Sequence, residues 1–433
     1  MIALALTLVS PAGAAGETVR LLSIDGPVTP AMISYFERGI ATAEREGDQA
    51  LIIQLDTPGG QTDLMLEIVQ IFRSAQVPIV VYVAPRGAQA ASAGTIITLA
   101  AHAAVMAPET TIGAASPVGP SGEDLGETMQ RKIKEDLQAT VRGLAERRGE
   151  EAVELAEAMI ADAKAVHANE ALASGLIDLV ADDIPQLLEG LDGSVVQVND
   201  EPVVLATSGA TVVESPLNPL ENLMHTVVNP TIVTVLMAIG VQAILIELSS
   251  PGGWIAGFVG VVCLGLGFYG LGVLPVNWLG LGLIGVAFVL FILDIKAPTH
   301  GALTVAGILT LIAGFLITFN YPGSPAFARV SVYLVVAIAL LMGGFFAFVL
   351  AKVLRAQKRP PSTGVESLIG AAAEVRTPLT PTGTVFINGE LWRAIADDDS
   401  EIPTGTRVEV VAVRGFLLHV RSLNGPSVPD HQT

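Results

Sequence analysis

The sequence is poor in charge, in cysteine and in histidine, and each scarcity excludes a class of function. Charged residues make up only 15% of the 433 residues and hydrophobic residues 51%, a balance that a wholly soluble protein rarely shows. The single cysteine lies inside an apolar run, so no disulfide framework or cysteine-rich zinc site is available. The net charge of −19 argues against a nucleic-acid partner. We therefore expect a membrane protein that holds no metal and no other cofactor.

The first 15 residues read MIALALTLVSPAGAA, a short apolar stretch that ends close to Ala-Gly-Ala. This ending is typical of a signal-peptidase site, although the basic residues that usually open a signal peptide are missing. A buried first strand is the alternative. We expect residues 1–15 to be a signal peptide and the domain that follows to be exported.

Residues 16–215 alternate short apolar runs with amphipathic ones. The pattern predicts strands at 18–24, 50–55 and 77–83, separated by helices at about 29–46 and 62–74, with further helices at about 125–148 and 151–162. Because strands and helices alternate, we expect an α/β domain built on a parallel sheet.

From residue 231 to about residue 351 the chain is almost continuously apolar. Turn residues divide this stretch into five runs, each long enough to cross a bilayer: 231–247, 253–273, 278–294, 301–319 and 331–351. Buried helices of a soluble protein do not explain the runs, because the region has too little polar surface to cover them. The sequence therefore predicts a helical membrane region over 228–355 with about five spans.

Basic residues beside these runs predict the orientation. No lysine or arginine lies at 218–229, before the first run, whereas four lie at 352–359, after the last. Lys296, after the third run, agrees with this bias, and Arg329, after the fourth, does not. Because cytoplasmic loops are enriched in lysine and arginine, we expect a protein of a bacterial-type inner (plasma) membrane. Its N-terminal domain would lie outside, in the periplasm, and its C-terminal domain in the cytoplasm.

Residues 361–425 predict a small all-β domain, followed by a short tail at 426–433. Five short strands are expected at 372–376, 383–387, 390–396, 407–413 and 416–421. This number and spacing are typical of an OB-type barrel. Basic and acidic residues are interspersed here, which favours a structural or protein-binding role over the nucleic-acid binding common in OB folds.

Ser92 is the strongest candidate for chemistry. It follows the apolar run 79–83 and opens an apolar helical stretch, among small residues that let another backbone approach its hydroxyl. The first N–H groups of a helix favour an anion at this position, which suits a nucleophile whose attack generates an oxyanion. The alternative is an ordinary helix N-cap, the usual role of a serine at a helix start.

A second corner, Asp56-Thr-Pro-Gly-Gly60, directly follows the strand 50–55. It is either a tight turn or a stretch of bare backbone that lets a substrate carbonyl reach an N–H. Both corners follow successive parallel strands, so we expect them to converge at the carboxyl edge of the sheet, where α/β domains bind ligands. We expect Gly59 and Gly94 to contact the substrate there.

A nucleophilic serine needs a base, and the histidines of this domain do not fit. His102 lies ten residues beyond Ser92 along a helical stretch, a separation of about 15 Å. His167 opens a polar helical stretch and is expected at the surface. No G-x-S-x-G elbow is present either. The lysines are Lys132, Lys134 and Lys164, each of which could instead be an ordinary solvated side chain; burial can lower the pKa of a lysine toward neutrality.

Three motifs resemble the membrane-bound serine proteases of the NfeD family. They are Asp56-Thr-Pro-Gly-Gly60, Ala91-Ser92-Ala93-Gly94-Thr95 and Met106-Ala-Pro-Glu-Thr-Thr-Ile-Gly-Ala-Ala-Ser-Pro-Val118. The family is similar in fold to ClpP, signal peptide peptidase A and the crotonases, and the resemblance covers nearly the whole chain. It implies a ClpP-like protease domain, a multi-span membrane region and a C-terminal OB-like domain.

The resemblance also implies roles for residues. Ser92 would be the nucleophile of a Ser-Lys dyad, and Lys132, in Lys132-Ile-Lys-Glu-Asp136, matches the family's base. Glu135 replaces the usual asparagine, and the neighbouring Lys134 is an alternative base. The backbone N–H groups of Gly60 and Ala93 would hold the oxyanion.

The resulting hypothesis is a membrane-bound serine endopeptidase that cleaves apolar segments of stomatin- or prohibitin-like membrane proteins. We expect it to contact lipid and to form a homo-oligomer. A non-enzymatic scaffold that organises such partner proteins is the main alternative. Acyl-CoA chemistry of the crotonase kind is a second alternative, against which export from the cytoplasm argues.

Overall fold

The computed structural model describes residues 18–119, 126–249, 254–296, 299, 301–322, 324–357 and 365–423. The expected signal peptide, residues 1–15, and the tail, residues 426–433, lie outside the described residues. The chain divides into two compact units, and the boundary in the sequence lies between Phe346 and Ala347. The first contains the N-terminal domain and most of the apolar helices, and the second contains the small β domain.

The N-terminal domain is built on a six-stranded sheet in which every pair of neighbours is parallel. The strand order is β11-β1-β2-β3-β5-β8. These strands are β1 (Thr18–Asp25), β2 (Ala50–Asp56), β3 (Ile79–Val83), β5 (Ala103–Met106), β8 (Leu179–Val180) and β11 (Thr211–Glu214). The predicted α/β class with a parallel sheet is confirmed.

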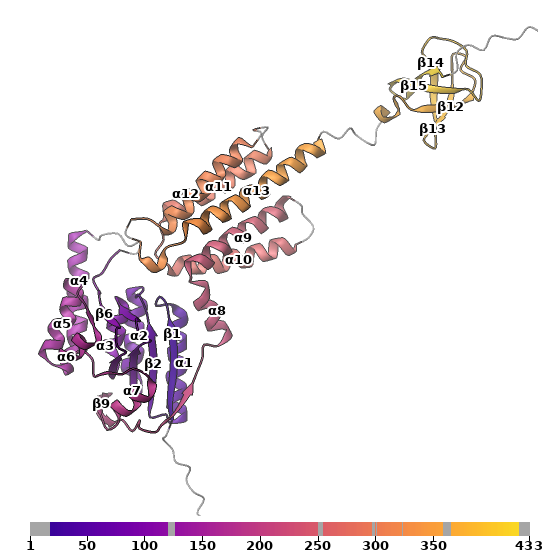
Figure 1. The fold of residues 1–433 in the computed structure, drawn as a ribbon. Coiled ribbons are helices and arrows are strands. Elements are labelled where there is room, and N and C mark those ends of the chain that lie inside the picture. The colour runs from indigo at the N-terminus through magenta and orange to yellow at the C-terminus, as the bar shows by residue number, and fades with distance from the viewer. Residues whose placement is uncertain are drawn as a thin grey trace, which may run out of the picture. The chain divides into compact units, whose positions relative to one another are not determined.

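Helices cover both faces of this sheet (Figure 1). In α1 (Pro30–Glu46), the Thr29 side chain caps the helix by accepting from the Met32 N–H, and a proline occupies the first helical position. One face is packed by α1, α2 (Thr62–Ser74), α3 (Ala93–Ala100), α4 (Glu127–Ala145), α5 (Glu150–Ala161) and α6 (Ala168–Ala173). The other is packed by α7 (Ile184–Leu191) and by the hairpin of β9 (Val195–Val198) and β10 (Glu201–Val204).

A second, smaller sheet was not expected from the sequence. It consists of β4 (Gln89–Ala91), β6 (Thr111–Gly113) and β7 (Ala165–His167). Single bridges between Thr57 and Ala90 and between Val28 and Gly60 extend it along the segments that leave β1 and β2. Three-residue strands are too short to show an alternating pattern, which explains why the sequence did not predict them. This layer lies at the carboxyl edge of the main sheet.

The apolar region forms five helices after the short α8 (Pro219–Val227): α9 (Pro230–Ser249), α10 (Ile255–Val273), α11 (Trp278–Lys296), α12 (Ala302–Phe319) and α13 (Val332–Gln357). The helices α9 and α10 lie side by side, as do α11 and α12 (Figure 1). Among the described residues, four segments are long and apolar enough to cross a membrane. They are Pro230–Glu247, Ile255–Val273, Ala302–Phe319 and Ala326–Phe348. The apolar part of α11, Trp278–Asp294, is shorter, so the expected count of about five is approximate.

The C-terminal unit contains the expected closed barrel of five strands, in the order β12-β13-β14-β16-β15. The strands are β12 (Ala372–Thr377), β13 (Thr382–Ile387), β14 (Glu390–Ala396), β15 (Arg407–Arg414) and β16 (Leu417–Ser422). Alternate residues such as Val385, Ala394 and Leu418 fill its core. The five strands match the ranges predicted from the sequence to within one residue at each end.

Candidate active site

Ser92 lies between β4 and α3 with φ 53° and ψ −120°. A side-chain-bearing residue rarely adopts this region, and such strain is concentrated at functional sites. Ser92 occupies the N-cap position of α3, yet its side chain makes no capping hydrogen bond. The ordinary N-cap role therefore does not explain this serine, and its hydroxyl remains available to a substrate.

Hydrogen bonds to β6 (Thr111–Gly113) hold Ser92 in this strained conformation. The Ser92 N–H donates to the Gly113 carbonyl at 2.9 Å, and the buried Thr95 hydroxyl lies 3.0 Å from the same oxygen. The Thr95 oxygen also accepts from the Gly113 N–H at 3.0 Å, and its hydroxyl lies 2.8 Å from the Ala90 carbonyl. Thr95 thus joins the start of α3 to both short strands and fixes the direction of Ser92.

The two glycine-rich corners converge, as the sequence predicted. A Cβ atom at Gly59, which has φ 109°, would lie 2.5 Å from the Ser92 Cβ and 3.0 Å from its Oγ. A Cβ atom at Gly94 would lie 2.5 Å from the Thr57 Cγ2. Only glycine permits these approaches. The predicted contacts of Gly59 and Gly94 with a substrate stay predictions.

Two backbone N–H groups close to Ser92 are unpaired. Neither the Gly60 N–H nor the Ala93 N–H donates to any atom of the described residues. Gly60 is exposed and follows the glycine that touches Ser92, while Ala93 is the first residue of α3, at the positive end of the helix dipole. Unpaired donors beside a nucleophile are what an oxyanion requires.

The lysines of the domain have different environments. Lys132 is exposed on α4, whereas the Lys134 Nζ donates to the Ala161 carbonyl at 2.7 Å, at the end of α5. Lys164 forms an exposed ion pair with Glu170 at 3.0 Å. Within the part of the chain that the structure describes, none of the three binds the Ser92 hydroxyl. Hydrogen bonds of catalytic groups are often long before substrate binds, so the base stays open between Lys132 and Lys134.

The histidines are unsuited to the role of base, as expected. The Ile79 N–H donates to the His102 Nδ1 at 2.9 Å, inside the core. Burial, reinforced by the nearby Arg147, lowers the pKa of His102 to about 4, so this imidazole is neutral at pH 7. His167 is exposed on β7, where it pairs with Thr111 of β6.

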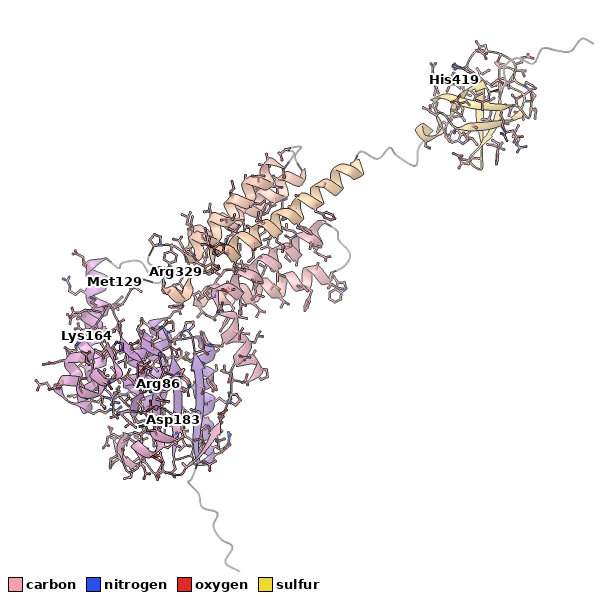
Figure 2. All side chains as sticks on the ribbon, viewed as in Figure 1. Arg86, Met129, Lys164, Asp183, Arg329 and His419 are labelled. Atoms are coloured by element: carbon pink, nitrogen blue, oxygen red, sulfur yellow. The ribbon has the colours of Figure 1, made fainter. Side chains whose placement is uncertain are left out.

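A large apolar side chain is exposed beside the exposed lysine. Met129 lies one helical turn before Lys132 on α4, so the two side chains share a face of the helix. The Met129 side chain is 56% exposed and projects from α4 (Figure 2). Val118, before residues 120–125, is also exposed. A peptide segment that crosses this face would meet apolar surface next to an amine.

Family models match the chain in three consecutive parts. The NfeD1b N-terminal domain matches residues 18–213, the NfeD integral membrane domain residues 231–352, and the NfeD-like C-terminal, partner-binding domain residues 365–421. A curated relative, the membrane-bound protease PH1510 of Pyrococcus horikoshii, is 35% identical over 414 residues. The match covers 94% of this chain and 93% of the relative. The chain belongs to the NfeD family.

Solved structures of NfeD-type N-terminal domains are similar to this chain. One is a lysine-to-alanine mutant of a membrane-bound stomatin-specific protease in complex with a substrate peptide. It is 34% identical, covers 49% of this chain and 98% of its own, and has a TM-score of 0.46. Another is a serine-to-alanine mutant of that protease, 35% identical over 47% of this chain and 99% of its own, with a TM-score of 0.43.

Proposed function

We propose that this chain is a membrane-bound serine endopeptidase that cleaves apolar segments of stomatin-like proteins. The observation that carries the proposal is Ser92, a strained and uncapped serine that touches the Gly59 corner. The related protease of the solved structures is described as stomatin-specific and binds a substrate peptide. The exposed Met129 and Val118 give an apolar segment a surface to contact.

The proposed reaction uses only residues of this chain and needs no cofactor. The Ser92 Oγ attacks the carbonyl carbon of the scissile peptide bond while a neutral lysine amine takes the hydroxyl proton. The N–H groups of Gly60 and Ala93 hold the oxyanion of the tetrahedral intermediate. The resulting ammonium gives its proton to the leaving amine, which departs and leaves an acyl-enzyme on Ser92. Water, deprotonated by the same lysine, then attacks the acyl carbon. The bond to the Ser92 Oγ breaks, the lysine returns the proton to that oxygen, and the acid is released.

Lys132 is the proposed base. It matches the family pattern, and its amine makes no hydrogen bond or ion pair with another group of the described residues. A lysine accepts a proton only as the neutral amine, which desolvation favours. Lys132 is exposed in the free chain, so we propose that the bound substrate segment covers it against the Met129 face of α4. Lys134 is the alternative, although its Nζ already donates to the Ala161 carbonyl.

Active-site labelling tests the proposal on the full chain in detergent. A fluorophosphonate probe should label the wild type and fail to label Ser92→Ala, which should also cleave no apolar peptide. The matched control is Ser116→Ala, because the Ser116 hydroxyl, on the segment after β6, already donates to the Ile160 carbonyl at 2.7 Å. Labelling of Ser92→Ala would refute Ser92 as the nucleophile. So would an equal loss of labelling and cleavage in Ser92→Ala and Ser116→Ala.

A non-enzymatic scaffold is the second candidate, because no base contacts Ser92 among the described residues. It predicts capture of a stomatin-like protein by Ser92→Ala as strong as that by the wild type, with no labelling of either. The remaining parts of the proposal are a homo-oligomer in contact with lipid and no nucleic-acid partner. The protease domain would lie outside the membrane and the barrel in the cytoplasm.

A further inference from the structure

The barrel carries an exposed aromatic patch that its core does not use. The patch consists of Phe386, Leu391 and Phe416; it is bordered by Trp392, which is half-buried and packs against the core. Leu391 is 65% exposed and Phe416, at the turn between β15 and β16, is 87% exposed. Phe386 lies directly opposite Leu391 across β13 and β14, so both side chains point to the same face. A shallow pocket of about 530 Å³ is lined by Glu390, Leu391, Trp392, Arg393 and Phe416.

The barrel limits how a partner can bind there. The strand β14 is paired with β13 on one side and with β16 on the other, and the barrel is closed. A peptide therefore finds no free strand edge to extend, and it must be recognised through side chains. Exposed aromatic residues around a pocket are typical centres of protein-binding surfaces.

The charged residues around the patch indicate the charge of the ligand that it binds. The Glu390 carboxylate already accepts from the Trp392 indole N–H at 3.1 Å. Arg393 and Arg414 are exposed beside the patch, and neither has an acidic partner among residues 365–423. Two free guanidinium groups next to an apolar surface complement carboxylates. An anionic membrane is a poorer ligand, because acidic residues outnumber basic ones over 365–421.

We propose that this aromatic patch binds a short apolar segment of a partner protein that carries carboxylates beside its large apolar side chains. The family model describes this domain as partner-binding, and the patch combines exposed aromatic side chains, a pocket and two arginines that have no acidic partner among residues 365–423. The inference rests on the proposed function only in taking the partner to be a stomatin-like protein. It does not require Ser92 to be a nucleophile.

Binding of designed peptides tests the patch on the full chain in phosphatidylcholine nanodiscs. The probe is a short fluorescein-labelled peptide in which leucine and phenylalanine are flanked by glutamate; its twin has lysine in place of glutamate. The glutamate peptide should bind and its twin should not. Phe416→Ser should weaken binding about tenfold, as loss of a central aromatic contact does. Arg393→Glu should reverse the preference between the peptides.

Matched controls lie at the other end of the same strands. Leu423 is 51% exposed, and its N–H donates to the Arg407 carbonyl at the start of β15, far along the strand from Arg414. Leu423→Ser and Arg407→Glu should leave binding unchanged. The proposal is overturned if the glutamate peptide does not bind, if the controls lose as much affinity as Phe416→Ser, or if phosphatidylglycerol vesicles bind and the peptide does not. Peptide cleavage by the same variants, read in parallel, keeps this outcome separate from that of Ser92.

Discussion

The Thr95 oxygen and the Gly113 backbone form a reciprocal pair: the Gly113 N–H donates to the Thr95 Oγ at 3.0 Å, and the Gly113 carbonyl lies 3.0 Å from the same atom. The Gly113 carbonyl also receives the Ser92 N–H. The hydroxyl of a buried threonine therefore helps to link the Ser92 corner to the small second sheet. Function and stability should both depend on it.

Thr95→Val keeps the shape of the side chain and removes this link. It removes the buried hydroxyl that accepts from the Gly113 N–H and contacts the Ala90 carbonyl, so we expect the free energy of unfolding to fall by about 1–3 kcal/mol. Cleavage and fluorophosphonate labelling should fall as well, because Ser92 loses its fixed direction. Thr98→Val is the matched control, since the Thr98 hydroxyl only donates to the Gly94 carbonyl one helical turn earlier. Thermal unfolding and labelling rates that are equal in the two variants would contradict the role of Thr95.

Alanine substitution should distinguish the roles of the two lysines of α4. Lys132→Ala removes an exposed side chain, so the melting temperature should stay unchanged while peptide cleavage falls by about 10³-fold, the loss typical of a general base. Lys134→Ala removes the cation at the last carbonyls of α5, so it should lower the melting temperature and leave most of the cleavage. The reverse result, a stable but inactive Lys134→Ala and an active Lys132→Ala, assigns the base to Lys134.

The sequence predicted the first three strands of the main sheet, most of the helices on one of its faces and the barrel, because long apolar runs and their turn residues are local signals. It also predicted the meeting of the Gly59 and Ser92 corners, since successive parallel strands end at one edge. The roles of Thr95 and Gly113 could not be predicted. They depend on β4 and β6, which are three residues long and too short to show an alternating pattern. The environment of each lysine depends on where α5 ends, which no local pattern records.

The buried His102 should make the free energy of unfolding depend on pH. The pKa of His102 is lowered to about 4 in the folded chain from an ordinary value of 6.5. As the pH falls from 6.5 toward 4, the unfolded chain binds a proton that the folded chain does not, so the folded state loses stability, by up to about 3 kcal/mol. His102→Asn keeps an acceptor for the Ile79 N–H and cannot titrate. Its unfolding free energy should therefore change less between pH 7 and pH 4.5.

His167→Asn is the control, because it removes an exposed imidazole and leaves the buried His102 in place. His102→Asn should also retain peptide cleavage at pH 7, as expected of a residue that only supports the core. If the unfolding free energy changes equally with pH in His102→Asn and in the wild type, His102 is not the cause of the pH dependence. Loss of fluorophosphonate labelling at an unchanged melting temperature would give His102 a part in the chemistry.

The helix α11 decides on which side of the membrane each end of the chain lies. Its apolar part is the shortest of the five, yet the Asp294 that ends this part is buried. The Asp294 carboxylate accepts from the Thr304 N–H at 3.2 Å and from the Thr299 and Thr304 hydroxyls, at the start of α12. Because this carboxyl group is buried and hydrogen-bonded within the protein, it does not face lipid. We therefore expect α11 to cross the membrane together with α12.

Thiol labelling of intact cells tests this count. In a Cys263→Ala background, which removes the only native cysteine, Ser208→Cys marks the exposed surface of the N-terminal domain and Ser400→Cys that of the barrel. Five spans place the two thiols on opposite sides, so an impermeant maleimide should label Ser208→Cys at once and Ser400→Cys only after the cells are permeabilised. If α11 does not cross, both thiols lie on one side and react together. Immediate labelling of Ser400→Cys alone would instead invert the orientation that the basic residues after α13 predict.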